Sequence, residues 1–194
     1  MSRLAAPRLL WLVALGAVLA APACGTAAPS PGPAGDASSG EQAVGRLLTV
    51  SDLAAAGVRT DGLEVRLEDL RALAEAVDAE QVREIESWYG LHFEMTERVI
   101  GLSLSVIDFD SAERAGRQLD LVESGPAFEP MASPVGDRSA WAGPRGGAGA
   151  ALAFVAGRRL VTVHSIAALG QEPLVDVAQV EALARLVEGR LAGL

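Results

Sequence analysis

An apolar run near the N-terminus, Leu9 to Ala20, most constrains what this chain can fold into. Arg3 and Arg8 precede the run and Ala21-Pro22-Ala23-Cys24 follows it, in the three-part order of a bacterial signal peptide. The run is shorter than the ~18 apolar residues that a spanning helix needs, so a transmembrane anchor is the less favoured interpretation. We therefore assign residues 1–23 to a cleaved leader and expect the folded part after it.

Cys24 is the only cysteine of the chain, so it has no partner for an internal disulfide. Its place after a small residue at the end of the apolar run resembles a bacterial lipobox, in which the cysteine becomes the mature N-terminus and carries lipid, such as palmitate, on its sulfur. Ala21 stands where a lipobox usually has Leu, and Ala21-Pro22-Ala23 also fits ordinary signal cleavage. We expect an envelope protein lipidated at Cys24 that faces the extracytoplasmic side, with secretion as the alternative.

The segment after the cysteine, Gly25 to Gly40, consists almost entirely of Pro, Gly, Ser, Thr and Ala. Such a composition cannot bury enough apolar surface to order a chain. Residues 24–43 are therefore predicted to be a flexible tether, followed by one domain over residues 44–194. A domain of that size buries roughly 70% of its unfolded surface and needs no disulfide to fold.

Charge limits the partners of this domain. The 194-residue chain has 16 basic side chains, all of them Arg, against 25 acidic ones, and its net charge is −9. Two of the arginines lie in the leader, so the mature chain is more acidic still. Nucleic-acid backbones and anionic lipid headgroups repel such a chain. We expect no nucleic-acid partner, and no cofactor motif stands out.

Periodicity predicts an α+β domain, with an antiparallel sheet and helices packed on one face. Alternating or apolar runs typical of strands cover residues 63–67, 91–95, 100–106, 150–156 and 160–166, with Trp141 on a further short strand. Helices are expected over residues 52–56, 68–88, 112–124 and 174–191. Asp78 is a possible cap of a second helix within the 68–88 segment.

Turn and cap residues divide these elements. Gly157-Arg158-Arg159 indicates a hairpin, and the apolar phase switches near Glu97-Arg98, which predicts a hairpin or a bulge there. Thr49 or Ser51 is expected to cap the first helix. Asp110, with Glu113 three residues later, has the pattern of a capping box.

Candidate metal ligands are few. His92 and Glu94 would share one strand face, but a zinc site needs three or four ligands. Asp108, Asp110 and Glu113 are acidic residues close in sequence that lack the spacing and the glycine of a calcium loop. We interpret the first pair as polar residues on a solvated face and expect no metal site.

Candidate catalytic residues are equally unspecific. Ser103 and Ser105 lie in the polar phase of a strand, outside any G-x-S-x-G pattern. Residues 143–149, GPRGGAG, lack the Lys-Ser/Thr ending of a phosphate loop and are predicted to be a loop, although Arg145 could bind an anion there. We expect no enzymatic activity. A site that joined Asp137, His164 and Arg145 would reverse that expectation.

The most distinctive short segment is Pro134-Val135-Gly136-Asp137, a tight turn shortly before Trp141. A helix, this turn, a strand and a glycine-tipped hairpin over about residues 98–192 resemble small uncharacterised bacterial envelope lipoproteins. They also resemble the extracytoplasmic sensor domains of some bacterial membrane kinases. The resemblance implies an extracytoplasmic α+β domain without known catalysis, and it assigns no functional residue.

Two non-enzymatic functions fit this sequence. The first is an accessory lipoprotein that presents an interaction domain to an envelope partner, which would expose an apolar patch of several hundred Å². The alternative is a carrier or sensor of a small apolar ligand. The small residues of Ala148 to Ala153 would then leave a cleft of more than about 300 Å³ between sheet and helices.

Overall fold

The computed structural model describes residues 39–77, 82–95, 97–143, 149–168 and 170–192. Several predictions concern residues outside this part of the chain. They are the leader at residues 1–23, the lipidated Cys24, the tether up to residue 38, the cap at Asp78, and the anion-binding Arg145. No helix in the described part is both long and apolar enough to cross a membrane.

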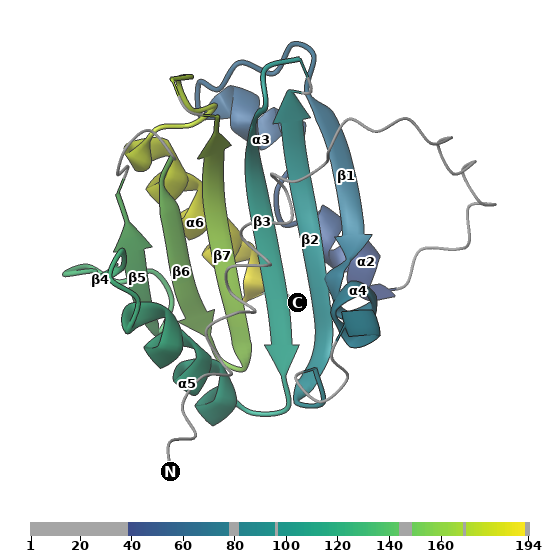
Figure 1. Cartoon of the computed structure of the whole chain (residues 1–194), viewed down its shortest axis with the longest axis vertical. Helices are drawn as coiled ribbons and strands as arrows, with labels where there is room; N and C mark the ends of the chain where they lie inside the picture. The colour runs from purple at the N-terminus through teal and green to yellow at the C-terminus, as the bar shows by residue number, and fades with distance from the viewer. Residues whose placement is uncertain (1–38, 78–81, 96, 144–148, 169, 193–194) are drawn as a thin grey trace. The chain divides into compact units, whose positions relative to one another are not determined.

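Helices and strands alternate irregularly along the described residues (Figure 1). They are, in chain order, α2 (Ser39–Gly45), α3 (Val50–Ala55), β1 (Glu64–Asp69), α4 (Leu70–Val77), β2 (Ile85–Met95), β3 (Ile100–Phe109), α5 (Ala112–Glu123), β4 (Glu129–Pro130), β5 (Arg138–Ala142), β6 (Ala151–Ala156), β7 (Arg159–Ala167) and α6 (Val177–Leu191).

The strands form a seven-stranded sheet in the order β1-β2-β3-β7-β6-β5-β4, and every neighbouring pair is antiparallel. Five of the six neighbouring pairs join strands that are consecutive in the chain, whereas β3 and β7 come from distant parts of it. The predicted α+β class with an antiparallel sheet is confirmed.

One face of the sheet carries the main core. Phe93, Leu104, Phe154 and Val163 are fully buried there, together with side chains from α2, α3 and α6 such as Leu183. These sheet residues alternate with residues that point the other way, as the pleat requires. Figure 1 shows α6 and α3 behind the sheet on this side.

The helix α5 packs on the opposite face, so the expected arrangement on one face holds for α2, α3 and α6 only. Arg138 of β5 points to this side and donates a hydrogen bond to the carbonyl oxygen of Gly116 in α5. Figure 1 shows α5 in front of the sheet. The reason lies in β6, where Ala151 to Val155 are all buried. A strand that is apolar on both faces needs a cover on each of them.

The helix predicted over residues 68–88 is wrong in its second half. Among the described residues of this range, Leu70–Val77 alone is helical, and Ile85–Met95 is the long strand β2. Pairing with β3 overrides the local helical pattern, because Trp88 lies opposite Ile107 and its Nε1 donates a hydrogen bond to Ser105 Oγ at 2.8 Å.

One of the predicted helix caps is confirmed and another is wrong. Thr49 caps α3 in a reciprocal box with Asp52, as the sequence indicated for one of its two candidates. The predicted cap of α5 at Asp110 is wrong, because Ser111 accepts the hydrogen bond from the Arg114 amide. Asp110 forms an ion pair with the Arg114 side chain instead, at 3.0 Å.

The phase switch near Glu97-Arg98 is the turn of the β2–β3 hairpin. Its last residue, Val99, has a φ of 49°, in the left-handed region that disfavours a β-branched side chain. Its carbonyl oxygen accepts a hydrogen bond from the Ala168 amide at 3.1 Å, which ties the hairpin tip to the end of β7.

Candidate functional site

An open groove of about 380 Å³ lies where the first turns of α6 face the ends of β4, β5 and β6. Its floor is the start of β6, from Ala150 to Leu152, and these three residues are buried. Ala150, which belongs to the main core on the side of α6, leaves space that a larger side chain would fill. This groove lies beside the small-residue segment for which the sequence predicted a cleft, and its volume exceeds the expected minimum.

The start of β6 is pressed closely against β7. Gly149 has a φ of 90°, and a Cβ atom on it would lie 1.9 Å from the carbonyl oxygen of Ser165. Ser165 donates its amide to the Ala150 carbonyl at 2.8 Å and its hydroxyl to the Val175 carbonyl at 2.9 Å. Because Val175 precedes the N-cap of α6, Asp176, these contacts fix the floor of the groove relative to that helix.

One wall of the groove is the segment 130–132, which crosses from β4 towards β5. The Met131 amide donates to the Ser139 carbonyl at 3.1 Å. Arg185 of α6 reaches the next part of the same segment and donates from Nη2 to the Ser133 carbonyl at 3.2 Å and from Nη1 to the Pro134 carbonyl at 3.5 Å. The wall is therefore tied both to the sheet and to α6.

The lining of the groove is apolar except at one point. Trp141 of β5 and Val177 and Val180 of α6 contribute apolar side chains, and Glu181 is the one acidic residue among the described lining. Glu181 Oε1 accepts hydrogen bonds from Arg185 Nε at 3.1 Å and Nη2 at 2.8 Å. The arrangement can hold an apolar molecule, with a polar group near Glu181.

The structure brings together three candidate residues that are distant in sequence. His92 of β2 pairs with Ser103 of β3, and Ser103 pairs with His164 of β7, so the three lie in one row across the sheet. They share the face opposite the main core. The strand order that creates this row is a long-range property, and no local sequence pattern signals it.

The prediction that His92 lies on a solvated face is wrong, since only 4% of it is exposed. Leu70 of α4 and the bare backbone of Gly90 enclose its ring: a Cβ atom on Gly90 would lie 2.7 Å from His92 Nε2 and 2.8 Å from Leu70 Cδ1. Neither ring nitrogen has a hydrogen-bond partner among the described residues, and Nε2 lies 3.7 Å from Glu68 Oε2. Burial lowers the pKa of His92 below its usual value.

Burial also lowers the pKa of His164, to about 4. Ser105, on the same face, accepts the indole hydrogen bond of Trp88, and Glu94 forms an ion pair with Arg66 at 3.3 Å. Within the described part of the chain, no three His, Cys, Asp or Glu side chains lie close enough together to hold a metal ion.

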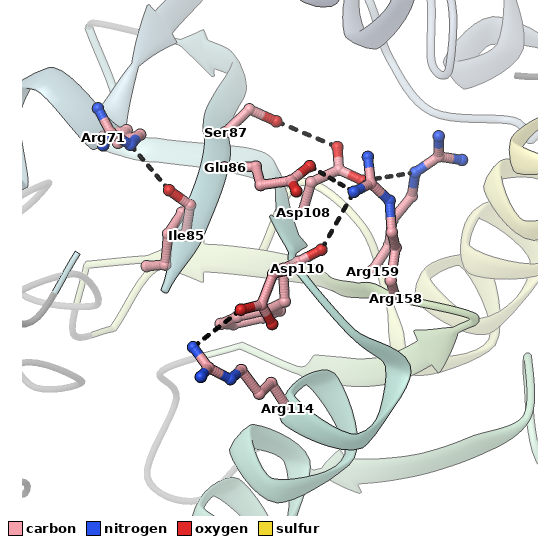
Figure 2. A network of polar contacts seen from close by, with 10 residues as sticks. Arg71, Ile85, Glu86, Ser87, Asp108, Asp110, Arg114, Arg158 and Arg159 are labelled. Atoms are coloured by element: carbon pink, nitrogen blue, oxygen red, sulfur yellow. Dashed lines mark hydrogen bonds and ion pairs between the residues drawn. The ribbon is translucent and has the colours of Figure 1, made fainter. Parts of the chain in front are cut away.

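The acidic residues around the start of α5 belong to an arginine network at one end of the sheet (Figure 2). Asp108 accepts hydrogen bonds from Arg159 Nε at 2.9 Å and from Ser87 Oγ at 3.1 Å. Arg158, in the β6–β7 turn, pairs with Glu86. Glu113, on α5, pairs with Arg117 one helical turn later. Asp108 and Glu86 therefore link β2, β3 and the β6–β7 turn, and Glu113 pairs only within α5, so these carboxylates have structural roles.

The distinctive turn at residues 134–137 also has a structural task. A Cβ atom on Gly136 would lie 2.3 Å from the Val155 carbonyl oxygen, which accepts the Asp137 amide at 2.8 Å. The carboxylate of Asp137 accepts the Gly157 amide at 2.8 Å. Asp137 therefore lies at the Gly157 end of β6, whereas His164 pairs with Ala151 at the other end. The structure does not bring these two candidate residues together.

Exposed large apolar side chains are scattered over the described surface. They come from α3, β1, the β2–β3 turn, α5 and α6, one from each. The residues are Val50, Val65, Val99, Leu121 and Leu186. Because each of these five residues comes from a different element, they do not form an apolar stripe on any single helix or strand.

Comparison with known proteins identifies no family for this chain. No protein-family model matches the chain, and no curated protein matches it. Among solved structures, the chain is similar to the crystal structure of the extracellular domain of PknH from Mycobacterium tuberculosis, with 13% sequence identity and a TM-score of 0.47. The similarity covers 79% of this chain and 97% of that one.

Proposed function

We propose that this protein is a non-enzymatic, lipid-anchored domain of the bacterial envelope that binds a small apolar ligand in the groove beside β6. The observation that carries the proposal is the groove of about 380 Å³ with mostly apolar lining residues beside the start of β6. Ligand pockets in proteins are typically concave, mostly apolar and ~300–1,000 Å³ in volume. This ranks the ligand-binding function above the partner-presenting one.

The side chains around the groove suit a flexible or planar apolar molecule. Met131 on the wall offers an unbranched thioether that adapts to different shapes, and Trp141 offers a large ring face. A charged ligand body would lose its hydration against these groups without compensation. The ligand is therefore apolar over most of its length.

The proposed location at the cell envelope rests on the sequence. The leader at residues 1–23 and the lipobox-like Cys24 support anchoring through acyl chains on the extracytoplasmic side. An anchored domain would meet apolar molecules of the envelope close to their source.

The binding of a neutral fluorescent probe tests the proposal. N-Phenyl-1-naphthylamine, whose emission rises in apolar surroundings, is titrated into the purified full chain and into the Ala132→Trp variant. Ala132 is exposed and lines the groove, so a tryptophan there occupies the space without disturbing the core. We expect saturable binding to the wild type and at least tenfold weaker binding to the variant.

Equal binding to both proteins would place the probe elsewhere and refute the groove as the site. Native mass spectrometry of protein purified gently from bacterial envelopes then identifies the natural ligand. An extra mass that organic extraction removes, and that the Ala132→Trp variant lacks, is the expected result.

A further inference from the structure

Glu181 is the one titratable side chain on the described lining of the groove, and its two carboxylate oxygens differ in their surroundings. Both hydrogen bonds from Arg185 go to Oε1. Oε2 accepts none from the described residues. Oε2 is therefore a hydrogen-bond acceptor without a donor among the described residues, on a side chain that lines an otherwise apolar groove.

Most of the N–H groups of Arg185 already donate hydrogen bonds within the protein. Its Nε and Nη2 point to Glu181, Nη2 also donates to the Ser133 carbonyl, and Nη1 donates to the Pro134 carbonyl. A ligand carboxylate would have to break these contacts to reach the guanidinium, and it would lie against the carboxylate of Glu181. Like charges held that close repel each other strongly in a partly desolvated site.

A cationic ligand head is disfavoured for the complementary reason. Glu181 is already neutralised by Arg185, so a second cation at Oε2 would lie beside the guanidinium while losing part of its own hydration. A neutral donor, such as a hydroxyl, meets neither obstacle. It would complete the hydrogen bonding of Oε2 and bring no charge into the groove.

From this geometry we propose that Glu181 selects apolar molecules that end in an uncharged hydroxyl, the chemistry of a monoacylglycerol or a long-chain alcohol. The inference rests on the proposed ligand-binding function and narrows its ligand class. Arg185 acts as a positioning residue, because it orients the Glu181 carboxylate and holds the Ser133 part of the wall.

The test compares three molecules that share a chain of twelve carbons and differ in their heads: monolauroylglycerol, laurate and dodecylamine. Each displaces N-phenyl-1-naphthylamine from the full chain at pH 7.5, below its critical micelle concentration. We expect monolauroylglycerol to compete at concentrations about tenfold lower than laurate, and lower than dodecylamine.

Two variants locate the selectivity. Glu181→Gln removes the negative charge at nearly constant size, and we expect laurate to gain about tenfold while monolauroylglycerol changes little. Glu113→Gln is the matched control, because Glu113 forms the same type of pair with an arginine one turn later, on α5 and outside the groove. It should leave all three affinities unchanged.

The negative results distinguish a failure of the proposed function from a failure of the inference on the head group. If the probe does not bind the wild type, the proposed function fails. If the probe binds but laurate or dodecylamine competes as well as monolauroylglycerol, or none of the three competes, the inference on the head group is wrong. An unchanged preference in Glu181→Gln overturns the role of Glu181 while leaving the groove as a binding site.

Discussion

Arg190 and Asp52 form a two-point ion pair across 138 residues of sequence, with Nη1 2.6 Å from Oδ2 and Nη2 2.7 Å from Oδ1. Arg190 Nη1 also donates to the Leu47 carbonyl at 3.0 Å. The last turn of α6 is thereby fastened to the first turn of α3, where Asp52 is part of the capping box with Thr49. One carboxylate thus serves a helix cap and a long-range contact together.

Replacing Asp52 by Asn should lower the free energy of unfolding by about 2 kcal/mol at pH 7. The hydrogen bonds from Arg190 lower the pKa of Asp52 from 3.8 to about 2. Its carboxylate therefore stabilises the fold fully above pH 4, and this contribution disappears as the pH falls through 2. Urea unfolding of the wild type and the variant at pH 7 and at pH 2 measures this contribution. Asp61→Asn, at an exposed turn, is the control, and an equal effect of both variants would contradict the expectation.

Acidification should destabilise the domain through its two histidines before Asp52 titrates. Because burial lowers the pKa of His164 to about 4, the folded state binds its proton less readily than the unfolded state does. Stability is complete above pH 6.5 and falls by up to about 3 kcal/mol as the pH drops to 4. His92 contributes with the same sign.

Urea unfolding between pH 7.5 and 4 checks this dependence. His164→Gln has no proton to gain, so its stability should fall less over this range than that of the wild type. Parallel pH profiles of the two proteins would show that His164 is solvated in the folded state.

Val99→Gly should stabilise the domain by about 0.5–1 kcal/mol. Strain in the left-handed conformation costs a β-branched residue more free energy than glycine costs through the larger conformational entropy of its unfolded state. Val65 is the matched control. It is 50% exposed, close to the 54% of Val99, but it lies in the extended strand β1. Val65→Gly should therefore destabilise. Thermal unfolding measures both changes, and the same sign for the two would refute the strain at Val99.

Gly149→Ala should destabilise by more than about 2 kcal/mol and weaken probe binding in the groove, because the new Cβ would collide with the Ser165 carbonyl. Gly170 has a similar φ of 82°, but nothing lies within 4 Å of its added Cβ. Gly170→Ala should cost only about 1 kcal/mol. Thermal unfolding of both variants separates the steric effect from the conformational one, and equal losses would argue against a close approach at Gly149.

Cys24→Ser should abolish incorporation of a clickable palmitate analogue and move the protein from the membrane to the soluble fraction of the cells that export it. Ser30→Ala, in the predicted tether, should leave both properties unchanged. A membrane-bound Cys24→Ser protein without label would point to an uncleaved leader, and a labelled one would exclude Cys24 as the acceptor.

Elements defined by local signals were predictable from the sequence. The final helix has an aspartate cap at Asp176 and an apolar stripe at helical spacing, and the β6–β7 hairpin has a glycine turn at Gly157. Both depend on residues close together in the chain. Residues 85–88 were misjudged as helix because only their pairing with β3, a tertiary contact, makes them a strand.

The candidate site was likewise predictable only in part. A cleft beside this part of β6 was predictable, because Ala148 to Ala153 offers little side-chain volume between sheet and helices. The wall at Met131 and the acceptor at Glu181 come from segments about 50 residues apart, and only the folded chain brings them together. His92 was assigned to a solvated face because alternation along β2 does not reveal that both faces of that strand are covered.

The pairing of β3 with β7 has a consequence for the time at which the domain can form. The centre of the sheet joins residues 100–109 to residues 159–167, so β3 lacks one partner until nearly the whole chain has been synthesised. Long-range pairing of this kind raises the contact order and slows folding. Translocation channels accept unfolded polypeptides, so such a delay would suit the export that we propose from the leader-like residues 1–23.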